Sequence, residues 1–262
     1  MRDGDSDLPA PSELERIATA VACAAAVVVT DAHRRPVLVG SKSSPTDVVT
    51  ETDLRAEDLI RRHLLEATPG AGVIGEERGE TLPGARLLWV TDPLDGTVNF
   101  LHGVPVFAVS IAAAVDGEVV AGAVVDVLRG EVFSAHLGGG ASRDGEPIAV
   151  SDCRSTAQAL VATGFSNRAE ERLRQGDVAA RLLPLAADLR CFGSAALELC
   201  WVACGRVDAY YQRGTELWDR AAGALIAAEA GAEIELPCPE NGDLVLAAGD
   251  GVFEELRALV QA

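Results

Sequence analysis

Residues 92–97, Asp-Pro-Leu-Asp-Gly-Thr, combine residue types and a spacing that suit phosphate chemistry assisted by a cation. An apolar run ends at Asp92, and the proline after it fixes φ and turns the chain, so Asp92 and Asp95 could meet at one point. Gly96 and Thr97 would then open a helix whose free N–H groups form an anion site. A plain surface turn is the alternative, because Asp, Pro and Gly are common in turns.

Three further carboxylates and one lysine stand next to apolar segments. Glu76 begins an acidic pair after a short apolar run, where a solvated loop is the alternative. Asp53 and Asp219 each stand at the start of a predicted helix, and each could be only a helix cap. Lys42 lies upstream of Asp53 and could be a surface charge. Taken singly, these four positions do not establish a site.

Charge and composition narrow the class of protein. The net charge of the 262 residues is −18, which argues against strong nucleic-acid binding, because nucleic acids are bound by cationic patches. An acidic protein that handles a phosphorylated substrate needs bound cations to offset repulsion, and clustered carboxylates would hold them. Apolar residues make up 48% of the chain, so a sizeable core is expected.

The sequence predicts neither a membrane segment nor a secretion signal. The longest apolar candidate, residues 17–30, is shorter than the roughly 20 residues of a membrane span. Residues 1–12 are acidic, lack the basic start of a secretion signal and are expected to form a frayed tail. The six cysteines are scattered without a CxxC pair, which favours free thiols in a reducing cytoplasm.

The pattern of predicted helices and strands changes near residue 150. Helices are expected over 12–30, with Ser12 and Glu15 as a capping box, and over 51–67. The strand-like runs that follow, with turn signals between them, predict an antiparallel meander and span 72–75, 87–91, 107–115, 119–127 and 131–135. Strands and helices then alternate over 159–163, 168–183, 188–192, 194–204, 207–211 and 219–230. We therefore expect an α+β lobe over 1–150 and an α/β lobe over 151–262, joined as one catalytic unit.

Taken together, the acidic segments resemble the inositol monophosphatase family, a branch of the lithium-sensitive, metal-dependent phosphatases. The matching segments keep family order and spacing over roughly residues 12–260, and they are 42–53, 75–77, 92–100, 193–200 and 218–231. The resemblance implies a layered αβαβα sandwich, of the type shared with fructose-1,6-bisphosphatase. It also implies a homodimer and inhibition by lithium.

The resemblance assigns the metal site residue by residue. It implies two or three Mg²⁺ ions, held by oxygen ligands from Glu76, Asp92, the Leu94 carbonyl, Asp95, Asp219 and, for a weaker ion, Asp53. All of these are the hard oxygen donors that Mg²⁺ prefers. Two such ions about 3.5–4 Å apart can clamp an in-line displacement. We therefore expect direct attack by water, with inversion at phosphorus.

The resemblance also assigns catalytic and substrate contacts. Glu76, Thr97 and Asp53 match the catalytic residues, with Thr97 and Asp53 orienting the attacking water. Lys42 lies on the loop near the metals. The expected substrate contacts come from both lobes and are Gly96, Thr97, Gly193, Ser194, Ala195, Gln212 and Asp219.

The implied activity is hydrolysis of inositol monophosphate to inositol and phosphate. One departure is Gln212, which stands where many members have a glutamate that bonds an inositol hydroxyl. Alternative substrates on the same scaffold are histidinol phosphate, fructose 1,6-bisphosphate and adenosine 3′,5′-bisphosphate. A regulatory protein that binds transcription or RNA machinery is the alternative from another class.

Overall fold

The strand-forming runs between residues 72 and 147 pair into one eight-stranded sheet in the computed structural model, which describes residues 8–33, 37–41 and 48–261. Its order is β10-β9-β8-β7-β6-β5-β3-β4, and all pairs are antiparallel except β3 with β5. The strands are β3 (Gly72–Gly75), β4 (Gly79–Thr81), β5 (Leu87–Asp95), β6 (Ala108–Val115), β7 (Glu118–Asp126), β8 (Glu131–His136), β9 (Ala141–Arg143) and β10 (Glu146–Pro147). The predicted meander is therefore confirmed from β5 onwards.

A second sheet of five strands is built from residues 160–248, in the order β12-β11-β13-β15-β14. Its strands are β11 (Leu160–Thr163), β12 (Asp188–Arg190), β13 (Ala209–Arg213), β14 (Glu233–Glu235) and β15 (Leu244–Ala248). β11 runs parallel to β12 and β13, whereas β15 is antiparallel to β13 and β14. β14 and β15 were not foreseen, and they close one side of the sheet. A separate hairpin joins β1 (Leu38–Ser41) to β2 (Val48–Thr50).

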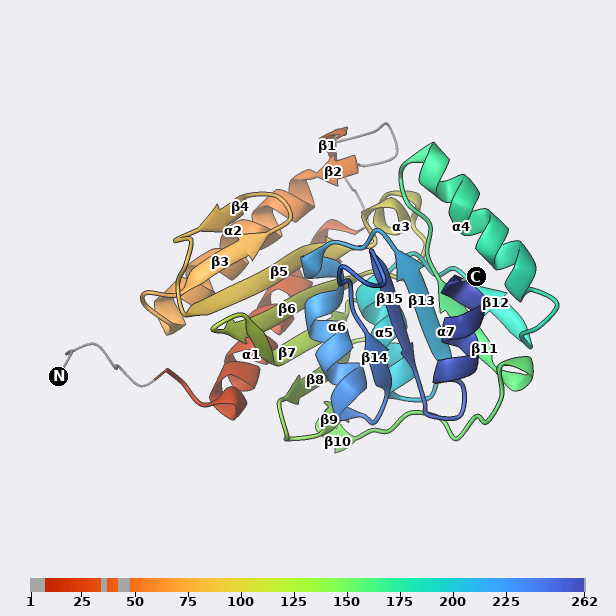
Figure 1. Cartoon of the computed structure of the whole chain (residues 1–262). Helices are drawn as coiled ribbons and strands as arrows, with labels where there is room; N and C mark the ends of the chain where they lie inside the picture. Colours follow the sequence, from red (N-terminus) through yellow and green to blue (C-terminus); the bar gives the residue numbers. More distant parts are fainter. Residues whose placement is uncertain (1–7, 34–36, 42–47, 262) are drawn as a thin grey trace.

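The helices complete an αβαβα stack, which confirms the predicted fold class (Figure 1). One face of the large sheet is covered by α1 (Pro11–Ala32) and α2 (Glu51–Ala67). The layer between the sheets holds α5 (Ala195–Ala203) and α6 (Leu217–Glu229). The outer side of the small sheet carries α4 (Ala169–Leu182) and α7 (Phe253–Gln261). Short helices, α3 (Thr97–His102) and η1 (Thr156–Gln158), lie in connections.

Small residues let the central layer pack closely. A Cβ added at Gly223 of α6 would lie 2.8 Å from Leu199 Cβ and 3.1 Å from the Ala196 carbonyl of α5. A Cβ at Gly122 of β7 would meet Ala222 of α6 at 3.0 Å. One core cluster therefore runs through this layer and joins residues of both sheets. This contiguity positions the start of α6 against the end of β5.

One local prediction is wrong. α1 begins at Pro11 with Ala10 as its N-cap, and no side chain caps it. Glu15 instead accepts a hydrogen bond from Ser134 Oγ at 2.7 Å and pairs with His136 Nδ1 at 2.5 Å. Strand β8 thus offers this carboxylate two polar partners, which is more than the single free N–H of a capping box.

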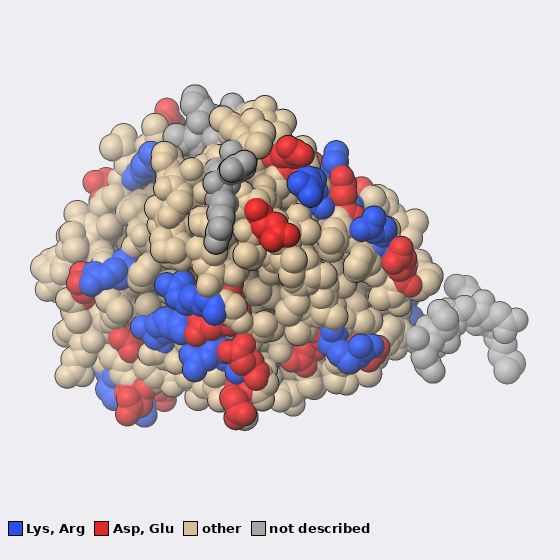
Figure 2. Space-filling model, turned by 180° about the vertical axis from the view of Figure 1, so that it is seen from behind, with Lys and Arg blue, Asp and Glu red and all other residues tan. Residues whose placement is uncertain are grey.

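Figure 2 shows acidic and basic side chains beside one another in small groups on the face seen there. Exposed ion pairs of the chain include Arg86 with Asp116 and Arg154 with Asp250. All six cysteines are free. Within residues 8–33, 37–41 and 48–261, no helix is long and apolar enough to cross a membrane.

Candidate active site

The turn from β5 into α3 brings the 92–97 segment to the surface of a cleft. β5 continues through Asp92 to Asp95, and its register with β6 shifts between these two residues. Asp92 Oδ1 accepts a hydrogen bond from Leu94 N at 2.9 Å, which tightens the bend. Gly96 has a φ of +94°, a left-handed conformation that glycine adopts without strain, and α3 follows directly. Both aspartates consequently line one pocket.

Asp53 joins α2 to this turn. It is the third residue of α2 and not its N-cap, which is Thr50. Asp53 Oδ2 accepts from the Thr50 amide at 2.8 Å and from the Thr50 hydroxyl. Asp53 Oδ1 lies 3.2 Å from Thr97 Oγ1, and the same hydroxyl lies 3.0 Å from the Leu94 carbonyl. The capping role and the contact with Thr97 therefore coexist, one on each carboxylate oxygen.

Asp95 reaches across to the second half of the chain. Its Oδ2 accepts from Ser194 Oγ at 2.6 Å and from the Ala196 amide at 2.8 Å. Asn99 Nδ2 adds a second bridge, because it donates to the Val106 carbonyl at 2.8 Å and to the Phe192 carbonyl at 2.7 Å. The loop before α5 is thus fixed against the β5–α3 turn.

Asp219 arrives at the cleft from α6. It is the third residue of that helix, and its Oδ2 accepts from the Glu216 amide at 2.8 Å. The cap predicted as its alternative role is present, and Asp219 also lines the pocket. Glu76, directly after β3, lines the same pocket.

These contacts enclose a cleft of about 850 Å³. It brings together most of the predicted residues, namely Glu76, Asp92, Asp95, Gly96, Thr97, Gly193, Ser194, Ala195, Gln212 and Asp219. Leu94 and Asp53 are fully buried behind it and meet it through Thr97. Lys42 lies outside the described residues.

Crowding and burial act together on the carboxylates. Burial raises the pKa of Asp92 well above its usual range, and the charges of Glu76, Asp95 and Asp219 raise it further. Burial also raises the pKa of Asp95 to about 6, although hydrogen bonds from Ser194 and Ala196 oppose the rise. The pKa of Asp219 is raised by burial and then by Asp95. A group of like charges in a partly dry cleft is costly unless a cation neutralises it.

The donor set fits a hard divalent cation. Every candidate ligand is an oxygen, and four of the candidate carboxylates line one cleft. Across the described part of the chain, no three acidic, histidine or cysteine side chains converge tightly enough to form a finished cage. Carboxylates that keep waters and substrate oxygens between them suit Mg²⁺, which retains several waters when bound.

Sequence reasoning missed two buried glutamates that hold loops of this site. Glu57 of α2 is fully buried; its Oε2 accepts from the Glu77 amide at 2.8 Å and its Oε1 from the Arg78 amide at 3.1 Å. Glu198 of α5 accepts from the Phe192 amide at 2.7 Å and from the Gly193 amide at 3.1 Å. The available signal was a glutamate within the apolar face of each helix.

Gln212 stands at the far side of the cleft. Its Oε1 accepts from Tyr210 Oη at 2.9 Å, and its Nε2 has no partner among the described residues. A Cβ at Gly164 would clash with this side chain, so Gly164 leaves it room. Its amide can therefore donate to a ligand in the cleft.

Comparison with known proteins places these features in a family. The model of the inositol monophosphatase family matches residues 10–260. Inositol-1-monophosphatase SuhB of Mycobacterium tuberculosis H37Rv is 46% identical over 235 residues, covering 85% of this chain and 81% of that protein. The Nus factor SuhB of Pseudomonas aeruginosa is 41% identical over 205 residues, covering 76% of each. The solved structure of Mycobacterium tuberculosis SuhB superposes with a TM-score of 0.83 at 41% identity and covers 96% of each chain.

Proposed function

The chain belongs to the inositol monophosphatase family, and on this premise we propose that it is a Mg²⁺-dependent phosphatase that hydrolyses inositol monophosphate. The observation that carries the proposal is one cleft that brings together four candidate ligand carboxylates, the β5–α3 turn and the loop before α5. Clustered carboxylates would bind cations that attract phosphate, and the turn offers amides for its oxygens.

Two or three Mg²⁺ ions would be held by the side chains of Glu76, Asp92, Asp95, Asp219 and Asp53 and by the Leu94 carbonyl. When bound, they supply a Lewis acid that acidifies water and stabilises the leaving alkoxide. Hydrogen bonds described above place the carboxylates of the four aspartates and the Leu94 carbonyl, and Glu76 directly follows β3. The protein therefore contributes a preorganised set of charges.

Thr97 and Asp53 orient the nucleophilic water. Asp53 Oδ1 and the Leu94 carbonyl both lie within hydrogen-bonding distance of the Thr97 hydroxyl, which fixes the direction of that hydroxyl. Glu76 faces the same cleft and is proposed to hold the water from its other side. The amides of Gly96 and Thr97 bind the phosphate, because they precede the first hydrogen-bonded turn of α3.

The alcohol of the substrate is proposed to contact the second half of the chain. Gly193, Ser194 and Ala195 line the cleft at the start of α5, and Asp219 and Gln212 face them from α6 and β13. The free Nε2 of Gln212 can donate to a hydroxyl. Histidinol phosphate, fructose 1,6-bisphosphate and adenosine 3′,5′-bisphosphate are the alternative substrates.

A second candidate function is regulatory. It is favoured by the similarity to a relative named Nus factor SuhB. The chain would then bind the transcription machinery through a surface outside the cleft, with the phosphatase site retained. We also propose a cytoplasmic homodimer that lithium inhibits, with residues 1–150 and 151–262 acting as one catalytic unit.

A panel of phosphate esters, assayed with and without Mg²⁺, tests the proposed function. We expect Mg²⁺-dependent turnover of inositol monophosphate, inversion at a chiral phosphorus, and loss of turnover in Asp92→Asn and Asp219→Asn. Asp250→Asn is the matched control, because Asp250 is an exposed partner of Arg154. Turnover in the two cleft variants equal to that of the control would refute the metal assignment.

Light scattering tests the proposed dimer, and a mass near the 27.2 kDa of one chain would contradict it. If the folded protein hydrolyses none of the esters, support would shift to the regulatory function. A pull-down with purified RNA polymerase and Nus factors would then decide that alternative.

A further inference from the structure

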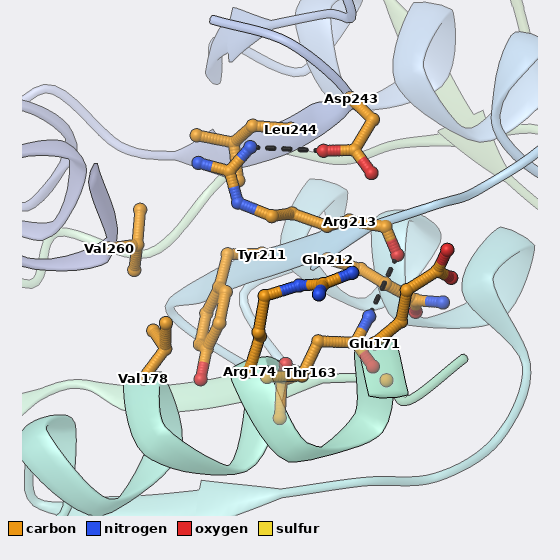
Figure 3. Close-up of a pocket in the computed structure, with 12 residues that line it drawn as sticks. Thr163, Glu171, Arg174, Val178, Tyr211, Gln212, Arg213, Asp243, Leu244 and Val260 are labelled. Atoms are coloured by element: carbon orange, nitrogen blue, oxygen red, sulfur yellow. Dashed lines mark hydrogen bonds and ion pairs between the residues drawn. The ribbon is translucent and has the colours of Figure 1, made fainter. Parts of the chain in front are cut away.

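A second, smaller pocket of about 310 Å³ adjoins the cleft. It lies where α4 faces β13 and β15, with Val260 of α7 at one side (Figure 3). Four residues line both spaces, and these are Gly164, Glu171, Gln212 and Asp243. The two spaces therefore meet at Gln212, the residue proposed above to contact the alcohol of the substrate.

The frame of this pocket is fixed by hydrogen bonds. Gln175 of α4 is buried; its Oε1 accepts from the Ser166 amide at 2.7 Å, and its Nε2 donates to the Arg213 carbonyl at 3.0 Å. Arg213 in turn pairs with Asp243 at 3.0 Å. Because α4, β13 and β15 are tied together, a ligand would meet a preformed space and lose little affinity to ordering.

The walls of the pocket are apolar on one side. Val178, Leu244 and Val260 line it together with the ring of Tyr211. Figure 3 shows the Tyr211 ring beside Val178, with the hydroxyl directed away from Gln212. This side suits a hydrocarbon or ring face, as ligand pockets usually do.

Among the charged side chains that line the pocket, the guanidinium of Arg174 is not neutralised by a carboxylate of any described residue. Glu171 accepts from Ser166 Oγ at 2.7 Å and pairs with Arg168 at 3.0 Å, and Asp243 is neutralised by Arg213. Arg174 also lines the pocket, and Figure 3 shows it projecting from α4 into this space. It has no hydrogen bond or ion pair with any described residue. In a chain of net charge −18, such a guanidinium beside an apolar wall selects an anion.

We propose that this pocket binds a small organic anion, with its carboxylate or phosphate on Arg174 and its apolar body against Tyr211. The proposal rests on the proposed function in one respect: the anion is either the distal end of a substrate whose phosphate lies in the cleft, or a separate small molecule beside it. Both sources share the same recognition chemistry.

Two measurements on the full chain separate these sources. The first compares kcat/KM for 4-carboxyphenyl phosphate and phenyl phosphate, which differ by one distal carboxylate. The second titrates benzoate alone by calorimetry. The variants are Arg174→Gln and Arg174→Lys, with Arg181→Gln as the matched control, because Arg181 is an exposed residue of α4 outside the pocket lining.

If the anion is part of the substrate, Arg174→Gln lowers the ratio of the two kcat/KM values about five- to tenfold, while Arg174→Lys retains most of it and Arg181→Gln leaves it unchanged. If the anion is a separate molecule, benzoate binds the wild type and weakens by a similar factor in Arg174→Gln only. A ratio and a benzoate affinity that do not respond to Arg174→Gln, or respond equally to Arg181→Gln, overturn the proposal. Arg174-dependent benzoate binding, with no hydrolysis of either ester or of inositol monophosphate, would support the pocket and refute the proposed function.

Discussion

Glu57→Gln is the sharpest test of how the fold positions Glu76. The side chain of Glu57 is fully buried, and its Oε1 pairs with Arg61 at 2.7 Å, whose side chain is only 11% exposed. Its two oxygens also accept the amides of Glu77 and Arg78. Every acceptor is therefore in use, and glutamine would have to turn an NH₂ donor toward another donor. The turn that carries Glu76 would lose its anchor.

The size of the effect follows from these contacts. Breaking one side of a buried ion pair costs about 3–5 kcal/mol, and the donor facing a donor is part of that cost. This is a large fraction of the roughly 5–15 kcal/mol that stabilises an ordinary domain. Because the turn would relax, we expect the Mg²⁺ concentration for half-maximal activity to rise about tenfold or more, while kcat at saturating Mg²⁺ falls less.

Urea unfolding and a Mg²⁺ titration of activity measure both effects. Asp58→Asn is the matched control, because Asp58 is the next residue on α2 and its pair with Arg78, at 3.0 Å, is exposed on both sides. The control should lose at most about 1 kcal/mol. The reasoning is wrong if Glu57→Gln unfolds at the same urea concentration as the control, or if it unfolds earlier with an unchanged Mg²⁺ requirement.

Three further perturbations test other parts of the structure. Gly96→Ala forces a side chain into a φ of +94° and places its Cβ 3.0 Å from the Val106 carbonyl. Turnover in steady-state assays should therefore fall at least about tenfold, and turnover equal to that of the wild type would contradict a fixed β5–α3 turn. Gly223→Ala would press α6 onto α5 and lower the free energy of unfolding by about 1–3 kcal/mol in urea, and an unchanged midpoint would argue against the close packing. Burial raises the pKa of Glu198 from 4.5 to about 8, so the folded carboxyl keeps a proton that the unfolded chain loses, and stability falls as pH rises through this window. Glu198→Gln should remove about 2 kcal/mol of the loss between pH 6 and pH 8, and parallel stability profiles of variant and wild type would refute the raised pKa.

Local patterns predicted most elements of the fold correctly. The helix over 51–67 and the hairpin at Asp116-Gly117 follow from apolar periodicity and from residues that accept a positive φ, 51° and 91° here. The short strands β1, β2, β4, β9, β10 and β14 are not predicted from the sequence, because runs of two to four residues carry little periodicity. β15 and α7, near the end of the chain, are longer elements that the structure adds to the predicted ones.

Individual roles were harder to predict than elements. Asp53 reads equally well as a cap or as a site residue, and the structure shows that it caps with one oxygen and meets Thr97 with the other. The capping box expected from Ser12 is absent, because Glu15 finds partners on β8 that are distant in sequence. The sequence pattern does not show whether a side chain will form its hydrogen bonds with nearby backbone or with a distant strand.

The sequence by itself determined which oxygen-bearing side chains the site can use. The Asp-Pro-Leu-Asp-Gly-Thr segment supplies two carboxylates and a turn, and its order with Glu76 and Asp219 indicates the family. Tertiary structure alone decided which loops are held and where the cleft extends, through Glu57, Glu198 and the pocket behind Gln212. The physical reason is that burial and hydrogen bonding between distant segments exist only after the layers have packed.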